Sequence, residues 1–367
     1  MTDTFVKLLV TMDANWISSV AVAMCYILCL YLWISRRRQS QRGQQRASRT
    51  LVNDASVKPL VDFYWKSARL SSLREFRSIY NISMGIKSDT PSALISMDER
   101  YLKRIEYRRE LMAEHAGTVL GVVPGGEAPV RELYDYLLRQ YLPVRFPLMF
   151  QLSARDTQLT NSVTGRSFPT KPPAETLEAL RILGEIVEED LVFLVPSPEG
   201  LRMVAHLWCF PSGFDPVAKL GNTLDAIHKP VPSYDKIGPS MQRFLSKLQS
   251  GKPIKRTNWS VQPHPELFDC NANLRLKDYE AIKSSEIRME DSYLRSELQT
   301  LSRLPNTGAI VFFIKTYMYN VSEIKAEGLG LQFADAIEGL KKGNAPGMWT
   351  YKGASHWGET VCKYMRS

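Results

Sequence analysis

The chain has 367 residues, of which 44% are hydrophobic and 23% are charged, and its formal net charge is +9. These proportions are typical of a globular protein and exclude a disordered, collagen-like or polytopic membrane chain. The five cysteines show no C-x-x-C spacing. The sequence therefore predicts neither a disulfide framework nor a zinc site, and it favours a reducing compartment.

The segment 14–35 (ANWISSVAVAMCYILCLYLWIS) carries no charged residue and is followed at once by three arginines. As a helix it would be about 33 Å long, enough to cross the hydrocarbon core of a bilayer. A signal peptide would carry its basic residues before the apolar run, and a buried core helix of this length would be unusual. We therefore expect a single-pass membrane anchor in contact with the lipid bilayer. The positive-inside rule then places the C-terminal domain in the cytosol, with the endoplasmic reticulum as a candidate membrane.

The same region accounts for most of the positive charge. Residues 1–50 contain seven basic and two acidic side chains, a net of +5 out of the total of +9. This excess is typical of a membrane-flanking cluster that contacts lipid headgroups, so nucleic-acid binding is not expected. The predicted division is a short tail (1–13), the anchor (14–35), a basic polar linker (36–56) and one domain (57–367).

The first part of that domain is predicted to be mainly helical. Amphipathic patterns favour helices over 97–114 and 130–141, and the dense charges of the first are typical of a solvated helix face. Residues 153–174 are polar and rich in Ser, Thr and Pro, which predicts a loop.

Between residues 174 and 320 the patterns predict five strands, two before and three after a helical region. The strands are expected over 190–195, 201–210, 255–262, 297–304 and 309–319, and helices over 174–189, 216–227 and 238–248. The simplest closure is an antiparallel five-stranded sheet with helices inserted between its second and third strands, the connectivity of a PAS-like domain. We therefore predict an α+β fold with a PAS-like core at about 174–320, an N-terminal helical extension, one transmembrane helix and a cavity between sheet and helices.

The chain has no H-E-x-x-H, Walker A, G-x-G-x-x-G, G-x-S-x-G or D-x-D sequence. Among its five histidines, His228 stands at the expected end of a helix, before the sequence Lys-Pro-Val-Pro that would fix its direction. A neutral imidazole held in this way beside an apolar cavity suits a single axial ligand to haem iron. A histidine stabilised by the helix dipole explains the position equally well. His206 is expected in the core, and the other three histidines in solvent.

Two further groups of polar side chains lie on predicted strands. One contains Asn258 and Trp259, and alternation places Arg295, Glu297 and Gln299 on one face of another strand. Such a face is usually solvated. If it lines the cavity instead, these groups could hold haem propionates or another polar ligand, because arginine pairs well with carboxylates.

Several segments resemble the family of haem-dependent oxidative N-demethylase alpha-subunit-like proteins. The similar segments are MGIK (84–87), MDERYLKRI (97–105), RFPLMF (145–150), EEDLVFL (188–194), CFPSGFDPVAKLGNTLDAIHKPVPSY (209–234), NWS (258–260) and LRSELQTLSRLPNTGAIVFFIKTY (294–317). The resemblance covers roughly residues 57–320. It implies a PAS-like fold that binds haem, expected to be haem b, and oxidatively demethylates a small amine. Electrons would come from separate flavin and iron–sulfur partner subunits.

The resemblance also implies site residues. It favours His228 as the iron ligand. Together with the polar groups of the predicted strands, the expected cofactor contacts are His228, Lys219, Tyr234, Asn258, Trp259, Arg295 and Glu297. The family pattern has an arginine where this chain has Leu298, which puts retained catalysis in question.

We expect a membrane-anchored, haem-dependent oxidoreductase that acts on a small amine or metabolite. Because the chain has no flavin motif and no set of iron–sulfur cysteines, its electron donor would be a separate reductase. A non-catalytic PAS-like sensor of haem or another ligand and a Golgi-type glycosyltransferase are the alternatives.

Overall fold

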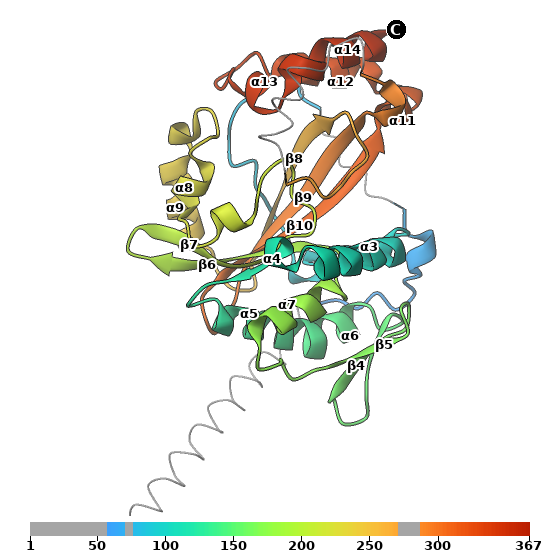
Figure 1. Ribbon diagram of the computed structural model, residues 1–367, viewed down its shortest axis with the longest axis vertical. Helices are drawn as coiled ribbons and strands as arrows, with labels where there is room; N and C mark the ends of the chain where they lie inside the picture. Colours follow the sequence, from blue (N-terminus) through green and yellow to red (C-terminus); the bar gives the residue numbers. More distant parts are fainter. Residues whose placement is uncertain (1–56, 70–75, 271–286) are drawn as a thin grey trace, which may run out of the picture. The chain divides into compact units, whose positions relative to one another are not determined.

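A seven-stranded antiparallel sheet organises the residues that the computed structural model describes, which are 57–69, 76–270 and 287–367 (Figure 1). The order of its strands is β1-β8-β9-β10-β6-β7-β2. Their bounds are β1 (Lys87–Ser88), β2 (Leu120–Val122), β6 (Asp190–Ser197), β7 (Gly200–Leu207), β8 (Ile254–Gln262), β9 (Tyr293–Arg303) and β10 (Ile310–Asn320).

The five predicted strands correspond to β6 to β10 and lie next to one another in this sheet. The predicted fold class is nevertheless wrong in the extent of its sheets. Two short strands, β1 and β2, extend the sheet at its edges, and a second sheet of three strands is present. That second sheet contains β3 (Phe150–Leu152), β4 (Gln158–Asn161) and β5 (Arg166–Pro169). Of these, β4 and β5 lie where a loop was predicted over 153–174. The alternating pattern of such short strands is too brief to stand out from a polar loop.

Helices cover both faces of the large sheet (Figure 1). One face buries Leu191, Phe193 and Phe313 in a core shared with the helical region that precedes β6. The helices of this region are α3 (Tyr101–Glu114), α4 (Ala116–Val119), α5 (Glu127–Tyr136), the π-helix η3 (Leu137–Tyr141), α6 (Leu142–Arg145) and α7 (Thr176–Gly184). Because both faces are covered, β10 reads as an almost continuous apolar run.

On the opposite face, α8 (Leu224–His228) and α9 (Gly238–Ser246) cover a smaller core. There Leu224 and Leu245 pack with Ile254, Leu301 and Ile314 of the sheet. Short 3-10 helices complete the described chain: η1 (Trp65–Ser67), η2 (Pro91–Ala93), η4 (Val217–Lys219), η5 (Tyr234–Lys236) and η7 (Met289–Asp291).

Residues beyond 320, for which the sequence patterns predict no element, form a helical group at one end of β8, β9 and β10 (Figure 1). The helices are α11 (Val321–Ala326), α12 (Gly330–Gly339), α13 (Met348–Tyr351) and α14 (Ala354–Arg366). Their apolar faces bury Tyr317 and Tyr319 of β10 and Val261 of β8. This group therefore encloses the end of the sheet that α8 and α9 leave uncovered.

The helix predicted over 216–227 is broken into η4 and α8. Gly221 has a positive φ of 80°, a conformation that glycine adopts without strain. The backbone here pairs with β7 instead, through Gly221 N to Met203 O at 2.8 Å and Met203 N to Asn222 O at 3.0 Å. Thr223 then starts a new helix, because its side chain accepts a hydrogen bond from Ala226 N at 3.3 Å. The break is what places His228 at the end of a separate short helix.

The prediction of a single-pass membrane protein, with its bilayer contact and cytosolic orientation, needs correction. Within the described ranges no helix is both long and apolar enough to cross a membrane. The longest of them, α3, has 14 residues, or about 21 Å, against a hydrocarbon core of about 30 Å. The segment 14–35, on which the prediction depended, lies outside the described residues.

Candidate functional site

The sheet face covered by α8 and α9 changes from apolar to polar along β8, β9 and β10. The register aligns Ile254 with Leu301, and Leu301 with Phe312, in an apolar row. The next two rows on this face contain the polar residues Arg256, Gln299, Asn258, Glu297 and Thr316. We call these five residues the polar rows. The sequence prediction that Glu297 and Gln299 share one face is therefore confirmed, and that face is partly buried.

Glu297 is held in one orientation by its neighbours. Its Oε2 accepts hydrogen bonds from Gln299 Nε2 at 2.8 Å and from Asn258 Nδ2 at 3.4 Å. Its Oε1 lies 3.6 Å from Arg295 Nε. The carboxylate thus has two amides and one guanidinium around it.

Arg295 is fully buried and is directed mainly at the protein itself. Its Nη2 donates to Phe210 O at 2.5 Å and its Nη1 to Leu267 O at 3.2 Å. Arg295 therefore ties two loops to β9 and lies beside Glu297, and its terminal nitrogens face two backbone carbonyls and the side-chain oxygen of Gln262.

Two buried polar atoms of the polar rows have no hydrogen-bond partner: Arg256 Nε and Thr316 Oγ1. Burial lowers the pKa of Arg256, an effect that Tyr80 and Glu297 oppose. An unsatisfied buried donor or acceptor costs about 1–3 kcal/mol, so such atoms are normally paired. Their presence on one sheet face fits a surface that receives a ligand with polar groups.

His228, the last residue of α8, presents one nitrogen to the helix and leaves the other without a partner among the described residues. Its Nδ1 lies 2.8 Å from Leu224 O, so Nδ1 carries the proton and Nε2 keeps its lone pair. Burial lowers the pKa of His228, and the charges of Lys219 and Arg256 lower it further, against the Leu224 carbonyl and Asp225. These effects together favour the neutral imidazole, the form that binds a metal ion.

Tyr234 and Lys219 are the other two site residues predicted from the same sequence string, and both lie near His228. The Tyr234 ring stacks on the His228 ring with centroids 5.1 Å apart and an angle of 11°. Its hydroxyl donates to Asp225 Oδ1 at 2.7 Å, which fixes the stack. Lys219 lies over the Phe214 ring at 4.6 Å, and burial lowers its pKa.

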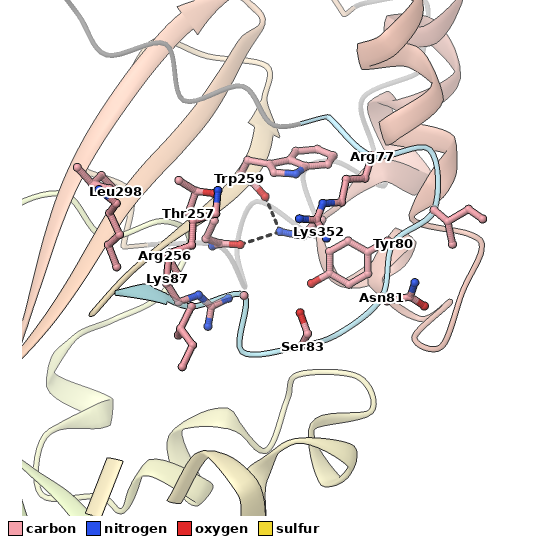
Figure 2. Close-up of a pocket in the computed structure, with 15 residues that line it drawn as sticks. Arg77, Tyr80, Asn81, Ser83, Lys87, Arg256, Thr257, Trp259, Leu298 and Lys352 are labelled. Atoms are coloured by element: carbon pink, nitrogen blue, oxygen red, sulfur yellow. Dashed lines mark hydrogen bonds between the residues drawn. The ribbon is translucent and has the colours of Figure 1, made fainter. Parts of the chain in front are cut away.

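Asn258 and Trp259 are joined by a residue that the sequence analysis missed. Lys352, just after α13, donates to Asn258 Oδ1 at 3.2 Å and to the Trp259 carbonyl. These residues line a cavity of about 470 Å³ between β8, the segment 77–87 and the turn that joins α13 to α14 (Figure 2). Leu298, on the sheet face opposite to Glu297, also lines it.

The structure thus divides the predicted residues into two groups. His228, Tyr234 and Lys219 lie together beside α8, and Asn258, Trp259 and Glu297 lie along β8 and β9. Arg256 is close to both, since its charge lowers the pKa of His228 and also that of Lys352. Arg256 lies two residues before Asn258 on the same strand, so the alternation of side chains could have identified it as a residue of this face. Lys352 carries no local sequence signal.

The other described histidines are engaged elsewhere. His206 is fully buried in β7 with Nε2 3.1 Å from Thr118 O, which confirms its expected place in the core. His264, expected in solvent, is instead mostly buried, and its Nδ1 lies 2.7 Å from a carboxylate oxygen of Glu266. In the described part of the chain, no group of three or more His, Cys, Asp or Glu residues could hold a metal ion.

These features define an α+β protein in which a neutral, helix-borne histidine lies close to a polar, incompletely hydrogen-bonded sheet surface. Residues 85–362 match the family described as haem-dependent oxidative N-demethylase, alpha subunit-like. The chain belongs to this family, as the sequence resemblance predicts. Membership connects the protein with haem and oxidative chemistry, and it leaves the glycosyltransferase alternative without support.

Proposed function

We propose that this protein binds haem b between α8 and the polar rows, with His228 Nε2 as the axial ligand to iron. The observation that carries the proposal is the His228 geometry: Nδ1 is bound to Leu224 O, and Nε2 is left with its lone pair. Iron-binding histidines commonly have their second nitrogen fixed in this way. Thr316 Oγ1, a buried atom of the polar rows without a hydrogen-bond partner, supports a ligand with polar groups on that face.

When bound, haem would supply the binding and activation of O₂ for oxidation of a small molecule, with N-demethylation of an amine as the type reaction. The chain would contribute orientation. Tyr234 restrains the imidazole by stacking, and Glu297 holds a fixed negative charge on the same sheet face as Arg256. The charge on Glu297 would attract a protonated amine or accept its proton. Electrons would come from a separate reductase, because the sequence has no flavin or iron–sulfur motif.

An absorption spectrum of the purified protein after haem reconstitution tests this proposal. We expect a Soret band with one haem per chain, which His228→Ala abolishes or shifts. His115→Ala is the matched control, since His115 stacks on Phe268 and is absent from the proposed site. Lack of a Soret band, or an unchanged spectrum in His228→Ala, would reject haem binding or this ligand.

A non-catalytic haem or ligand sensor is the second candidate, and Leu298 is the observation that favours it. Leu298 lines the cavity at a position where the family pattern has an arginine, so a charge is missing there. NADPH-dependent release of formaldehyde from a secondary methylamine, with a reductase added, distinguishes the two candidates. Turnover above the haem-free control supports the enzyme, and haem binding without turnover supports the sensor.

A further inference from the structure

The cavity of about 470 Å³ beside β8 has an unusual charge composition. Its fifteen lining residues include five cationic side chains and no carboxylate: Arg77, Lys87, Lys255, Arg256 and Lys352. We call it the cationic cavity. In Figure 2, Arg77, Tyr80, Ser83 and Lys352 surround one space, with Arg256 across from them. The positive charges come from three separate parts of the chain, so they are brought together only by folding.

The innermost cations lack a carboxylate partner. Lys352 donates to a carbonyl and to an amide oxygen, both neutral acceptors. Arg256 has a buried Nε without a partner, and the nearest acid acting on it is Glu297, which is already shared by two amides and Arg295. Lys255, at the rim, is ion-paired with Asp89 at 3.1 Å. Burying positive charge without a counterion is costly, so the cavity is organised to receive an anion.

We propose that the cationic cavity binds the carboxylate or phosphate group of a small-molecule ligand, with Arg256 and Lys352 as its principal contacts. An arginine fork and a lysine ammonium together suit an oxyanion, to which they would donate charge-assisted hydrogen bonds. Tyr80 and Ser83 add neutral hydroxyl groups on the opposite wall. This proposal stands without haem, because every group that carries it belongs to the chain.

Isothermal titration of the haem-free full chain with sulfate and, separately, with succinate tests the proposal. Chloride at matched ionic strength serves as the blank. We expect saturable binding of one anion per chain, weakened at least tenfold by Arg256→Met and by Lys352→Met. Lys103→Met, an exposed change on α3, should leave the affinity within about twofold. Thermal melts establish that each variant is folded. Arg77→Met, at an exposed position of the cavity wall, provides a further variant of the cavity.

The pH dependence gives a readout that a structural role would not change. Lys352 is surrounded by Arg256, Glu297, Arg77 and Tyr80. Burial and Arg256 lower its pKa to about 8, against Glu297. Sulfate keeps its charge between pH 7 and pH 9.5, roughly, so a loss of affinity over that range reports the protein. We expect an approximately tenfold loss in the wild type and a flat profile in Lys352→Met.

Three results would overturn the proposal. The first is the absence of saturable binding beyond chloride, and the second is an affinity equal to wild type in both Arg256→Met and Lys352→Met. The third is one-for-one displacement of sulfate by added haem, which would assign these cations to haem propionates. Sulfate binding that persists in haem-loaded protein supports a separate ligand. Failure of haem binding is read from the Soret band alone, so the two proposals fail independently.

Discussion

The same sheet carries two clusters of buried charge that differ in how the charge is compensated. In the first, Lys315 of β10 lies 2.8 Å from Glu188 and 2.9 Å from Asp98, and all three side chains are at most 5% exposed. We call this the buried ion cluster. In the second, the cationic cavity, Lys352 and Arg256 face neutral groups and only a shared acid.

The pKa values of the two lysines shift in opposite directions because their charges are compensated differently. Burial alone would lower the pKa of Lys315, but Glu188, Tyr317 and Asp98 reverse the effect and raise it. For Lys352, burial and Arg256 outweigh Glu297, and the pKa falls to about 8. A compensated buried charge fixes the structure, whereas an uncompensated one beside a cavity indicates a place for a ligand.

The largest expected effect comes from breaking the compensated cluster. Lys315→Met should lower the free energy of unfolding by about 3–5 kcal/mol, because Asp98 and Glu188 are then left buried without a countercharge. Urea unfolding followed by circular dichroism measures the change. A loss below about 1 kcal/mol would mean that the cluster contributes no more than a surface pair.

The lowered pKa of Lys352 in the cationic cavity should make the free energy of unfolding depend on pH. The unfolded chain protonates Lys352 up to its ordinary pKa of 10.5, whereas the folded chain releases that proton near pH 8. The unfolded state therefore binds more protons between these values, and the free energy of unfolding contributed by Lys352 rises with pH across this window. The gain is on the order of 2–3 kcal/mol. Lys352→Met should remove this rise when unfolding is measured from pH 7.5 to pH 10, roughly.

Two arginine variants compare a buried charge that has a counterion with one that lacks its own, while the residue type stays the same. Arg108 is fully buried and paired with Asp190 at 2.7 Å, so Arg108→Met should cost about 3–5 kcal/mol. Arg256→Met should leave the free energy of unfolding within about 1 kcal/mol of the wild type or raise it, because a poorly compensated charge is removed. Equal losses in both variants, measured by urea unfolding, would show that Arg256 is as well compensated as Arg108.

The smallest effect is expected at the rim of the cationic cavity. The side chain of Lys255 is 41% exposed and its ion pair with Asp89 is open to solvent. Lys255→Met should therefore change the free energy of unfolding by no more than about 0.5 kcal/mol. A loss above about 1.5 kcal/mol in thermal or urea unfolding would show that the rim belongs to the structural core.

The sequence by itself determined β6, β7 and β10, because strands buried on both faces leave apolar runs bounded by Pro, Gly and Asn that can be recognised locally. Alternation likewise placed Glu297 and Gln299 on one face. The string around His228 identified the family, since it is long and contiguous. The helix over 216–227 was predicted incorrectly because Gly221 and Asn222 pair with β7, a contact that local periodicity does not contain.

Only the tertiary structure decided where the charges meet. Arg77, Arg256 and Lys352 are far apart in the chain, and their convergence depends on the C-terminal helices closing over the end of the sheet. The compensation of Lys315 by Asp98 and Glu188 is equally non-local. In sequence these residues are single charges with identical local signals. Folding decides which become buried ion pairs and which remain without a partner, because Coulomb energy depends on distance and burial rather than on position in the chain.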